Sequence, residues 1–200
     1  MRSFKTYITE ATGKGLTIFD VDETLFHTKA LVDVVKDGKV VRQLDNQEYN
    51  TYKLKAGEEY DYHQFRNAEV FQKTSSPIAK MIGKMKIILR NATAAGSKVI
   101  VVTARKDFDN KEMFLNTFKA HGIDIDKSYV ERAGNLDLGS PAKNKRFVFH
   151  KYLRSGQYKR IRLFDDSKAN LNSFKALAKS YPDVTFEAWF VNKNGTTKKF

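Results

Sequence analysis

The chain contains no cysteine, so disulfide bonds, thiolate catalysis and cysteine-ligated metal centres are excluded. It also lacks any run of about 18 apolar residues, the length that a membrane-spanning helix needs. The first fifteen residues have no apolar stretch of the kind found in secretory signals. We therefore expect a cytoplasmic protein with no membrane partner.

The 200 residues are 41 % hydrophobic, which is enough for one domain, or one domain with a small insertion, around a real core. The net charge of +13 is uneven. Residues 141–200 hold 14 Lys and Arg against 4 Asp and Glu, whereas residues 1–140 hold 22 against 19. This asymmetry predicts an anionic partner, either nucleic acid or a phosphorylated substrate. An equally good interpretation is a solvated basic surface that aids solubility.

Short apolar runs alternate with segments of helical spacing along most of the chain. The runs that predict buried strands are 15–19, 98–102, 128–131, 161–164 and 184–191. The segments that predict helices are 78–95, 108–120, 140–154 and 168–180. Such alternation indicates an α/β fold with a parallel sheet and helices on both faces.

Residues 28–76 interrupt this alternation and are predicted to form a small inserted cap. Within 31–44, Asp37-Gly38 lies between two β-branched runs, which is a strong hairpin signal. The rest of the insertion is polar and aromatic. Its aromatic side chains either pack the cap onto the core, the interpretation we favour, or stack on a base. Residues 1–14 are predicted to be a polar tail or a short helix.

Polar side chains follow three of the predicted strands, and two lysines open a predicted helix. These residues are Asp20, Asp22, Thr103, Arg105, Asp165, Asp166, Lys143 and Lys145. Carboxyl ends of parallel strands meet at one edge of a sheet, so the side chains are expected to lie close together. Four carboxylates cannot all ionise there without a cation, and oxygen ligands of this kind suit Mg²⁺. A carboxylate beside the metal can serve as nucleophile, a second one as acid and base, and a hydroxyl and a lysine can hold phosphoryl oxygens.

Each of these features alone has a simpler interpretation. An Asp-x-Asp pair is common in surface turns, a strand-end threonine can cap a helix, and acidic residues are favoured where a helix starts. A lysine at a helix start can simply be solvated. The combination of three apolar strands, each followed by the required residue type in this order, favours a functional site.

These motifs resemble those of the haloacid dehalogenase (HAD) superfamily of phosphohydrolases. Its first motif, DxDx[TV], is matched by residues 20–24, and its second by VIVVTAR, which contains Thr103. The third motif is a lysine at a helix start, and the fourth is the acidic pair of LFDDS. The resemblance covers about 15–27 and 77–191. It implies a HAD-like Rossmannoid core made of 15–27 and 77–200, with residues 28–76 as the cap.

By position, the resemblance implies a role for each motif residue. Asp20 would be the nucleophile and a Mg²⁺ ligand. Asp22 would be the general acid and base, and would bind the metal through its backbone carbonyl. Thr103 would bind the phosphoryl group. Asp165 and Asp166 would hold Mg²⁺, with Asp166 the more direct ligand.

The resemblance leaves two points open, namely which lysine belongs to the site and what conformation the loop after Asp22 adopts. Lys143 and Lys145 are two residues apart on a helix, so only one can face the site. We favour Lys145, because the segment after it looks like the helix that usually follows the family lysine. Glu23 stands where the common motif has glycine, and we expect a changed loop with activity retained. The presence of Asp22 favours a phosphatase over a dehalogenase.

The sequence therefore predicts a Mg²⁺-dependent phosphomonoester hydrolase that acts through an aspartyl-phosphate. A small cap would leave the site open to a nucleotide or to the terminal phosphate of a nucleic acid, with further contact through basic residues 141–200. The alternative is a nucleic-acid-binding or assembly-associated protein with little catalysis on the same scaffold. The opening segment and the cap also resemble HAD-like proteins of large tailed bacteriophages, which would place the protein in the host cytoplasm.

Overall fold

The computed structural model describes residues 13–200, and its centre is a six-stranded sheet of order β11-β10-β9-β1-β7-β8. The strands are β1 (Lys14–Phe19), β7 (Lys98–Thr103), β8 (Tyr129–Arg132), β9 (Tyr158–Asp165), β10 (Thr185–Val191) and β11 (Thr197–Lys199). Neighbouring strands are parallel except for β11, which pairs antiparallel with β10. The predicted parallel sheet is confirmed. The sequence did not predict β11, because its three polar residues carry no apolar pattern.

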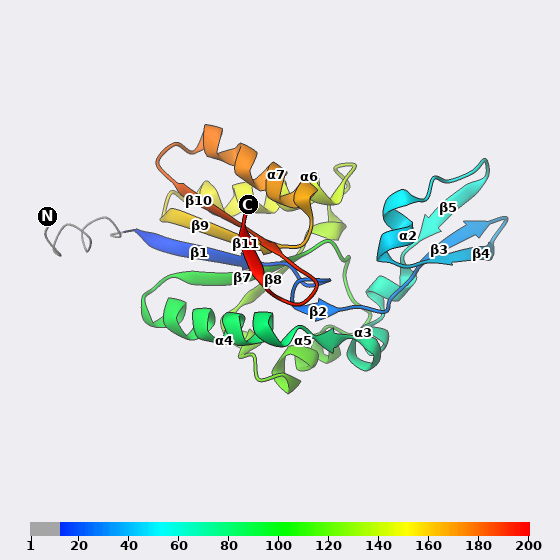
Figure 1. The fold of residues 1–200 in the computed structure, drawn as a ribbon, viewed down its shortest axis with the longest axis horizontal. Coiled ribbons are helices and arrows are strands. Elements are labelled where there is room, and N and C mark those ends of the chain that lie inside the picture. Colours follow the sequence, from blue (N-terminus) through cyan, green and yellow to red (C-terminus); the bar gives the residue numbers. More distant parts are fainter. Residues whose placement is uncertain (1–12) are drawn as a thin grey trace, which may run out of the picture.

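Helices cover both faces of this sheet (Figure 1). One layer contains α4 (Ala79–Ala94), α5 (Lys111–Ala120) and α3 (Ala68–Thr74), and the other contains α6 (Pro141–Leu153) and α7 (Lys168–Ala176). Short 3-10 turns occur at Ile125–Lys127, Ala133–Asn135 and Leu177–Ser180. The fold class predicted from the sequence is confirmed. None of the helices within residues 13–200 has the length and apolar character to cross a bilayer.

Two helix boundaries differ from the prediction by more than one residue. Helix α5 begins at Lys111 rather than at residue 108, because the side chain of Asn110 caps it by accepting the N–H of Met113. Helix α7 ends at Ala176, and the chain continues as the 3-10 turn that follows. Helix ends commonly tighten in this way.

Alternation along the strands builds a core on each face of the sheet. Leu16 and Ile18 of β1 pack in one apolar cluster with residues of α6 and α7. Phe19, the next residue, packs in the other cluster with residues of α4 and α5. Successive side chains of a strand point to opposite faces, so a strand covered on both faces is apolar at nearly every position. This explains why the β1 segment is apolar from Leu16 to Phe19, with Thr17 as the one exception.

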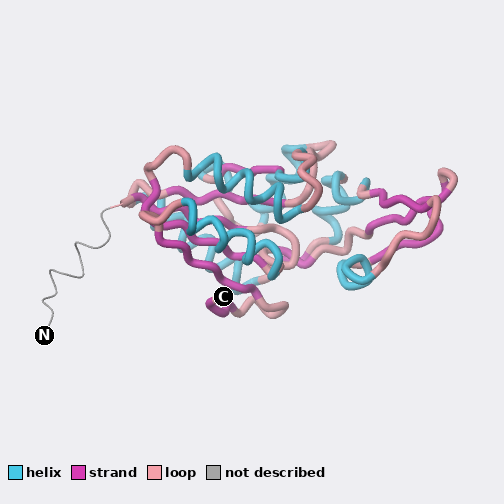
Figure 2. Tube along the Cα trace, turned by 90° about the horizontal axis from the view of Figure 1, so that it is seen from above, coloured by secondary structure: helices cyan, strands magenta, loops and turns pink. Residues whose placement is uncertain are grey.

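A second, smaller sheet projects beyond the end of the core (Figures 1 and 2). It contains β3 (Val32–Lys36), β4 (Lys39–Leu44) and β5 (Glu58–Asp61), in the order β4-β3-β5, and is accompanied by α2 (Asn46–Thr51). Asp37 and Gly38 turn the β3–β4 hairpin with φ of 50° and 73°. The predicted hairpin is therefore confirmed. The third strand, β5, was not predicted.

The insertion leaves and rejoins the core at a short antiparallel pair, β2 (Phe26–His27) with β6 (Ser76–Pro77). Its return segment passes through a 3-10 turn (His63–Arg66) and α3, which packs on α5 and buries Phe71 in the main core. Packing thus assigns α3 to the core, although the predicted cap extends to residue 76. Whether core and cap act as separate domains stays a prediction. The expected tail at 1–14 lies outside the described residues up to residue 12, and Lys14 already belongs to β1.

Candidate active site

The candidate site forms where β1 and β9 lie side by side and both end in aspartates. Asp20 follows β1, and Asp165 ends β9. The backbone N–H of Asp20 donates to the carbonyl of Phe164 at 3.1 Å, so the two strand ends are held together. From β1 the chain continues to β7 on one side, and β9 lies on the other side. Reactive groups collect at such a switch point at the carboxyl end of a parallel sheet.

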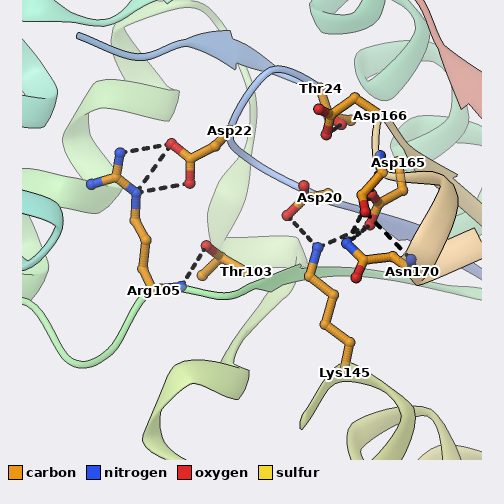
Figure 3. Close-up of polar contacts among 10 residues, drawn as sticks. Asp20, Asp22, Thr24, Thr103, Arg105, Lys145, Asp165, Asp166 and Asn170 are labelled. Carbon is orange, nitrogen blue, oxygen red and sulfur yellow. Dashed lines mark hydrogen bonds and ion pairs between the residues drawn. The ribbon is translucent and has the colours of Figure 1, made fainter. Parts of the chain in front are cut away.

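Lys145 of α6 reaches these two aspartates (Figure 3). Ser140 caps the helix by accepting the N–H of Lys143, and Pro141 occupies the first turn. The Nζ of Lys145 lies 2.8 Å from Oδ1 of Asp20 and 2.9 Å from Oδ2 of Asp165, and the side chain is buried. The side chain of Lys143 is exposed instead. Of the two candidate lysines, the structure therefore brings only Lys145 to the aspartates.

Asp165 is the most firmly held carboxylate of the site, and it is fully buried. The side-chain amide of Asn170 donates to both of its oxygens at 3.0 Å, and the N–H of Ser167 donates at 2.8 Å. The sequence analysis did not single out Asn170. Its position in the first turn of α7, three residues after the capping Ser167, is the signal that could have identified it.

Asp20, Asp165 and Asp166 form a group that could hold a metal ion. One carboxylate oxygen from each lies within 4.8 Å of the others. The hydroxyl of Thr24 donates to Oδ1 of Asp166 at 3.4 Å, which links this aspartate to the loop after β1. Carboxylate oxygens in this number are the donors that a hard divalent cation prefers, with water and substrate oxygens completing the coordination. The residues therefore fit Mg²⁺.

Two carboxylates of this group, those of Asp20 and Asp166, have raised pKa values. Burial raises the pKa of Asp20 well above its ordinary value, against the attraction of Lys145 and with the repulsion of Asp165, Asp166 and Asp22. Burial and the charge of Asp165 raise the pKa of Asp166 to about 7. Burial alone would lower the pKa of Lys145, but the attraction of Asp165 and Asp20 raises it. Lys145 therefore stays charged, and the aspartates together need more positive charge than one lysine supplies.

Asp22 stands apart from this group and faces Arg105 (Figure 3). The Nη2 of Arg105 donates to Oδ1 of Asp22 at 2.7 Å, and its Nε donates to Oδ2 at 3.0 Å. The backbone N–H of Arg105 donates to Oγ1 of Thr103 at 3.1 Å, and Thr103 is fully buried at the end of β7. All of the predicted strand-end residues thus lie at one end of the sheet. Arg105, which had no predicted role, joins two of them.

Glu23 adopts the left-handed backbone conformation, with φ of 54°, that glycine favours. Its side chain contacts Nδ1 of His27 at 2.8 Å and accepts the N–H of Thr28 at 3.1 Å. These two contacts offset part of the cost of a side chain in this conformation. The loop therefore differs from the common motif in the contacts of this side chain. Glu23 turns the backbone as glycine would and ties the loop to the start of the insertion.

A cavity of about 500 Å³ lies next to Asp22, between the cap and the loops of the core. The cap contributes Tyr49, Tyr62 and Phe65 to its lining, and the core contributes Arg105 and Lys106. The hydroxyls of Tyr49 and Tyr62 are hydrogen-bonded to each other at 2.9 Å. Cavities of this size hold small organic ligands. This cavity is therefore large enough for a small organic molecule beside Asp22.

No protein-family model matches the chain, and no curated protein matches it closely in sequence. Among solved structures, it is similar to the HAD domain of the effector protein Lem4 from Legionella pneumophila. The similarity covers 88 % of this chain and 84 % of that one, with 10 % identity and a TM-score of 0.52. Nothing in these comparisons bears on the resemblance to bacteriophage proteins, which stays a prediction. The chain therefore has a HAD-like fold.

Proposed function

We propose that this protein is a Mg²⁺-dependent phosphomonoester hydrolase that forms an aspartyl-phosphate on Asp20. The observation that carries the proposal is the group of Asp20, Asp165 and Asp166 beside the buried Lys145. A cluster of this composition at the carboxyl end of a parallel sheet suits the binding of a phosphoryl group. The HAD-like fold is consistent with this activity, but fold alone does not imply it.

Asp20, Asp165 and Asp166 would hold the metal ion, and Asp22 would add its backbone carbonyl. When bound, Mg²⁺ would neutralise the carboxylates and draw charge from the phosphoryl oxygens. The raised pKa values of Asp20 and Asp166 support this assignment, because they reflect buried negative charge with too little compensation. Asn170 would keep Asp165 in a fixed orientation.

In the first step, a carboxylate oxygen of Asp20 attacks the phosphorus atom. The bond between phosphorus and the ester oxygen breaks, and the departing oxygen takes a proton from Asp22. Lys145 and Thr103 bind the phosphoryl oxygens during the transfer. The products are the alcohol and the phosphorylated side chain of Asp20.

In the second step, a water molecule attacks the phosphorus of the aspartyl-phosphate and gives a proton to Asp22. The bond between phosphorus and the Asp20 oxygen breaks, which releases inorganic phosphate and restores the carboxylate. Asp22 is then protonated and ready to serve as the acid again.

The cavity beside Asp22 would receive the leaving group. Its tyrosines and Phe65 suit a planar group, and Arg66 and Lys106 add positive charge to its lining. A nucleotide or the phosphorylated end of a nucleic acid meets these requirements. The basic segment 141–200 would favour the nucleic acid.

The proposal is tested by measuring phosphate release from a panel of phosphomonoesters with and without Mg²⁺. The panel includes nucleotides and oligonucleotides with 3′- or 5′-phosphates. Asp20→Asn is expected to lower turnover by about 10³-fold or more, because the nucleophile is lost while the shape is kept. Asp37→Asn is the matched control, since it makes the same change in the exposed hairpin turn of the cap.

Release that requires Mg²⁺ and disappears only in Asp20→Asn would establish the enzyme. Substantial activity of Asp20→Asn would exclude Asp20 as the nucleophile. If the wild-type protein releases phosphate from no substrate, the binding protein with little catalysis becomes the better interpretation.

A further inference from the structure

Arg105 is a buried arginine at the junction of core and cap. Only 3 % of the residue is exposed, and its guanidinium has polar partners on three separate segments. Nε and Nη2 donate to the carboxylate of Asp22. Nη2 also donates to Oγ1 of Thr28 at 3.0 Å, and Nη1 donates to the carbonyl of Phe65 at 3.1 Å.

Aromatic rings fix the guanidinium from its other sides. Its central carbon lies 4.9 Å from the ring centroid of Phe65, 4.8 Å from that of Phe71 and 5.8 Å from that of Phe108. A guanidinium that is stacked on rings and hydrogen-bonded at each nitrogen has little freedom to turn. The carboxylate that it binds by two parallel hydrogen bonds is therefore held in one orientation.

The partners of Arg105 connect the acid to the cap. Thr28 lies just after β2, where the chain leaves the core, and Phe65 lies on the segment that returns from the cap sheet. One guanidinium therefore binds both connections of the cap together with Asp22. A movement of the cap relative to the core would change the contacts of Arg105 and, through them, the orientation of Asp22.

We infer that Arg105 is a positioning residue, which sets the orientation of Asp22 for proton transfer to the leaving group and couples it to the cap. This inference rests on the proposed function, in which Asp22 is the acid. A purely structural role would require only that Arg105 hold the cap on the core. The two roles differ in their effect on substrates whose leaving groups need a proton to different degrees.

The experiment compares phenyl phosphate with p-nitrophenyl phosphate, which have similar shapes. Nitrophenolate departs readily without a proton, whereas phenolate depends more on the acid. Asp22→Asn serves as the reference and is expected to slow turnover of phenyl phosphate far more than turnover of p-nitrophenyl phosphate. Arg105→Met is expected to show the same selectivity, with a loss in kcat of about 10-fold or more for phenyl phosphate only.

Three further variants make the test specific. Arg105→Met in the Asp22→Asn background should cause little additional loss, because both changes remove the same proton transfer. Arg105→Lys should restore little, since lysine cannot form the paired hydrogen bonds. Arg162→Met removes an arginine that pairs with Glu187 at 2.6 Å within the sheet, and it should not change the ratio of the two rates.

An equal loss on both substrates in a folded Arg105→Met protein, or a change in KM alone, would overturn the inference. If Arg105→Met does not fold, Thr28→Val removes a single contact of the guanidinium and should shift the same ratio in the same direction. A flat ratio in Asp22→Asn would instead refute Asp22 as the acid. A wild-type protein that releases phosphate neither from these two substrates nor from the nucleotide and oligonucleotide panel would overturn the proposed function and this inference with it.

Discussion

The core and the cap of this protein are built on different amounts of apolar packing. The core has an apolar cluster on each face of its sheet, both formed by residues of strands and helices. The cap has a single cluster with three fully buried members, Val32, Val34 and Leu44, and partly buried aromatic rings complete it. Tyr49, Tyr60 and Tyr62 contact one another edge-on or tilted, with centroids 5.1–6.0 Å apart.

In the proposed reaction, the core and the cap have different roles. Asp20, Asp165 and Lys145 are buried in the core, which suits groups that must keep their positions. The cap contributes side chains to the cavity but none to the group of Asp20, Asp165 and Asp166. Changes in the core should therefore alter catalysis and metal binding, whereas changes in the cap should alter substrate preference.

The largest effect is expected when the two lysines of α6 are replaced by alanine, one at a time. Lys145→Ala removes the cation from between Asp20 and Asp165, and we expect kcat to fall by about 10²–10³-fold. Lys143→Ala is the matched control, because its exposed side chain should leave kcat unchanged. Steady-state kinetics at saturating Mg²⁺ provides the measurement, and circular dichroism checks the fold. A larger effect of Lys143→Ala would show that the site is assembled differently.

A second test uses the raised pKa of Asp166 in the metal-free protein. Its folded-state pKa of about 7 lies above the ordinary 3.8, so the stability it contributes is present below about pH 4 and is lost as the pH rises through 7. Asp166→Asn removes this loss. We expect the metal-free variant to be more stable than wild type at pH 8, by about 1–2 kcal/mol, and to gain nothing near pH 4.

Thermal unfolding in a chelator at the two pH values measures this effect. Mg²⁺ should reverse the order at pH 8, because the wild-type protein binds the ion and the variant loses a ligand. Identical pH dependence of the two proteins would mean that the pKa of Asp166 is not raised in the folded protein. It would also weaken its assignment as a metal ligand.

A third test addresses the cap. Tyr62 lines the cavity and is 39 % exposed, so Tyr62→Ala should leave the cap folded. We expect its KM for a nucleoside monophosphate to rise about fivefold or more, while the KM for glycerol phosphate stays the same. Tyr129→Ala, at a 54 % exposed position on β8, is the control. A fall in kcat on both substrates would contradict the separation of chemistry from substrate preference.

The smallest effect is expected at Glu23, in the loop that connects core and cap. Glu23→Gly relieves the left-handed backbone but removes the contacts to His27 and Thr28, and the two changes are each worth about 1 kcal/mol. We therefore expect a shift in the unfolding temperature of no more than a few degrees and a similar kcat. The control Glu112→Gly, in the first turn of α5, should destabilise without such compensation. A large loss of activity in Glu23→Gly would mean that its side chain takes part in the site.

Much of the core could be predicted from the sequence. A strand such as β7, covered on both faces, contains a continuous apolar run at 99–102, and α6 begins with a capping serine and a proline. These signals are local, so they can be identified in a single sequence. Elements without a clear local signal were missed, among them α2, α3 and β5 within residues 28–76 and the polar edge strand β11.

The same distinction applies to the candidate site. The acidic residues were identifiable because each follows an apolar strand at a fixed distance. The choice of Lys145 over Lys143 depended on which face of α6 lies against the sheet. The role of Arg105 depends on a partner far away along the chain, and the role of Asn170 depends on how the chain turns from β9 into α7.

By itself, the sequence determined the alternation of the main strands and helices of the core, the hairpin turn and the residues at the strand ends. Each of these depends on side-chain periodicity or on the conformational preferences of neighbouring residues. Only the tertiary structure decided that Asp22 faces Arg105 rather than Asp20, and that one guanidinium joins the acid to both connections of the cap. Asp22 and Arg105 are 83 positions apart, and no local preference specifies such a contact. It follows from the way the sheet and the insertion pack together.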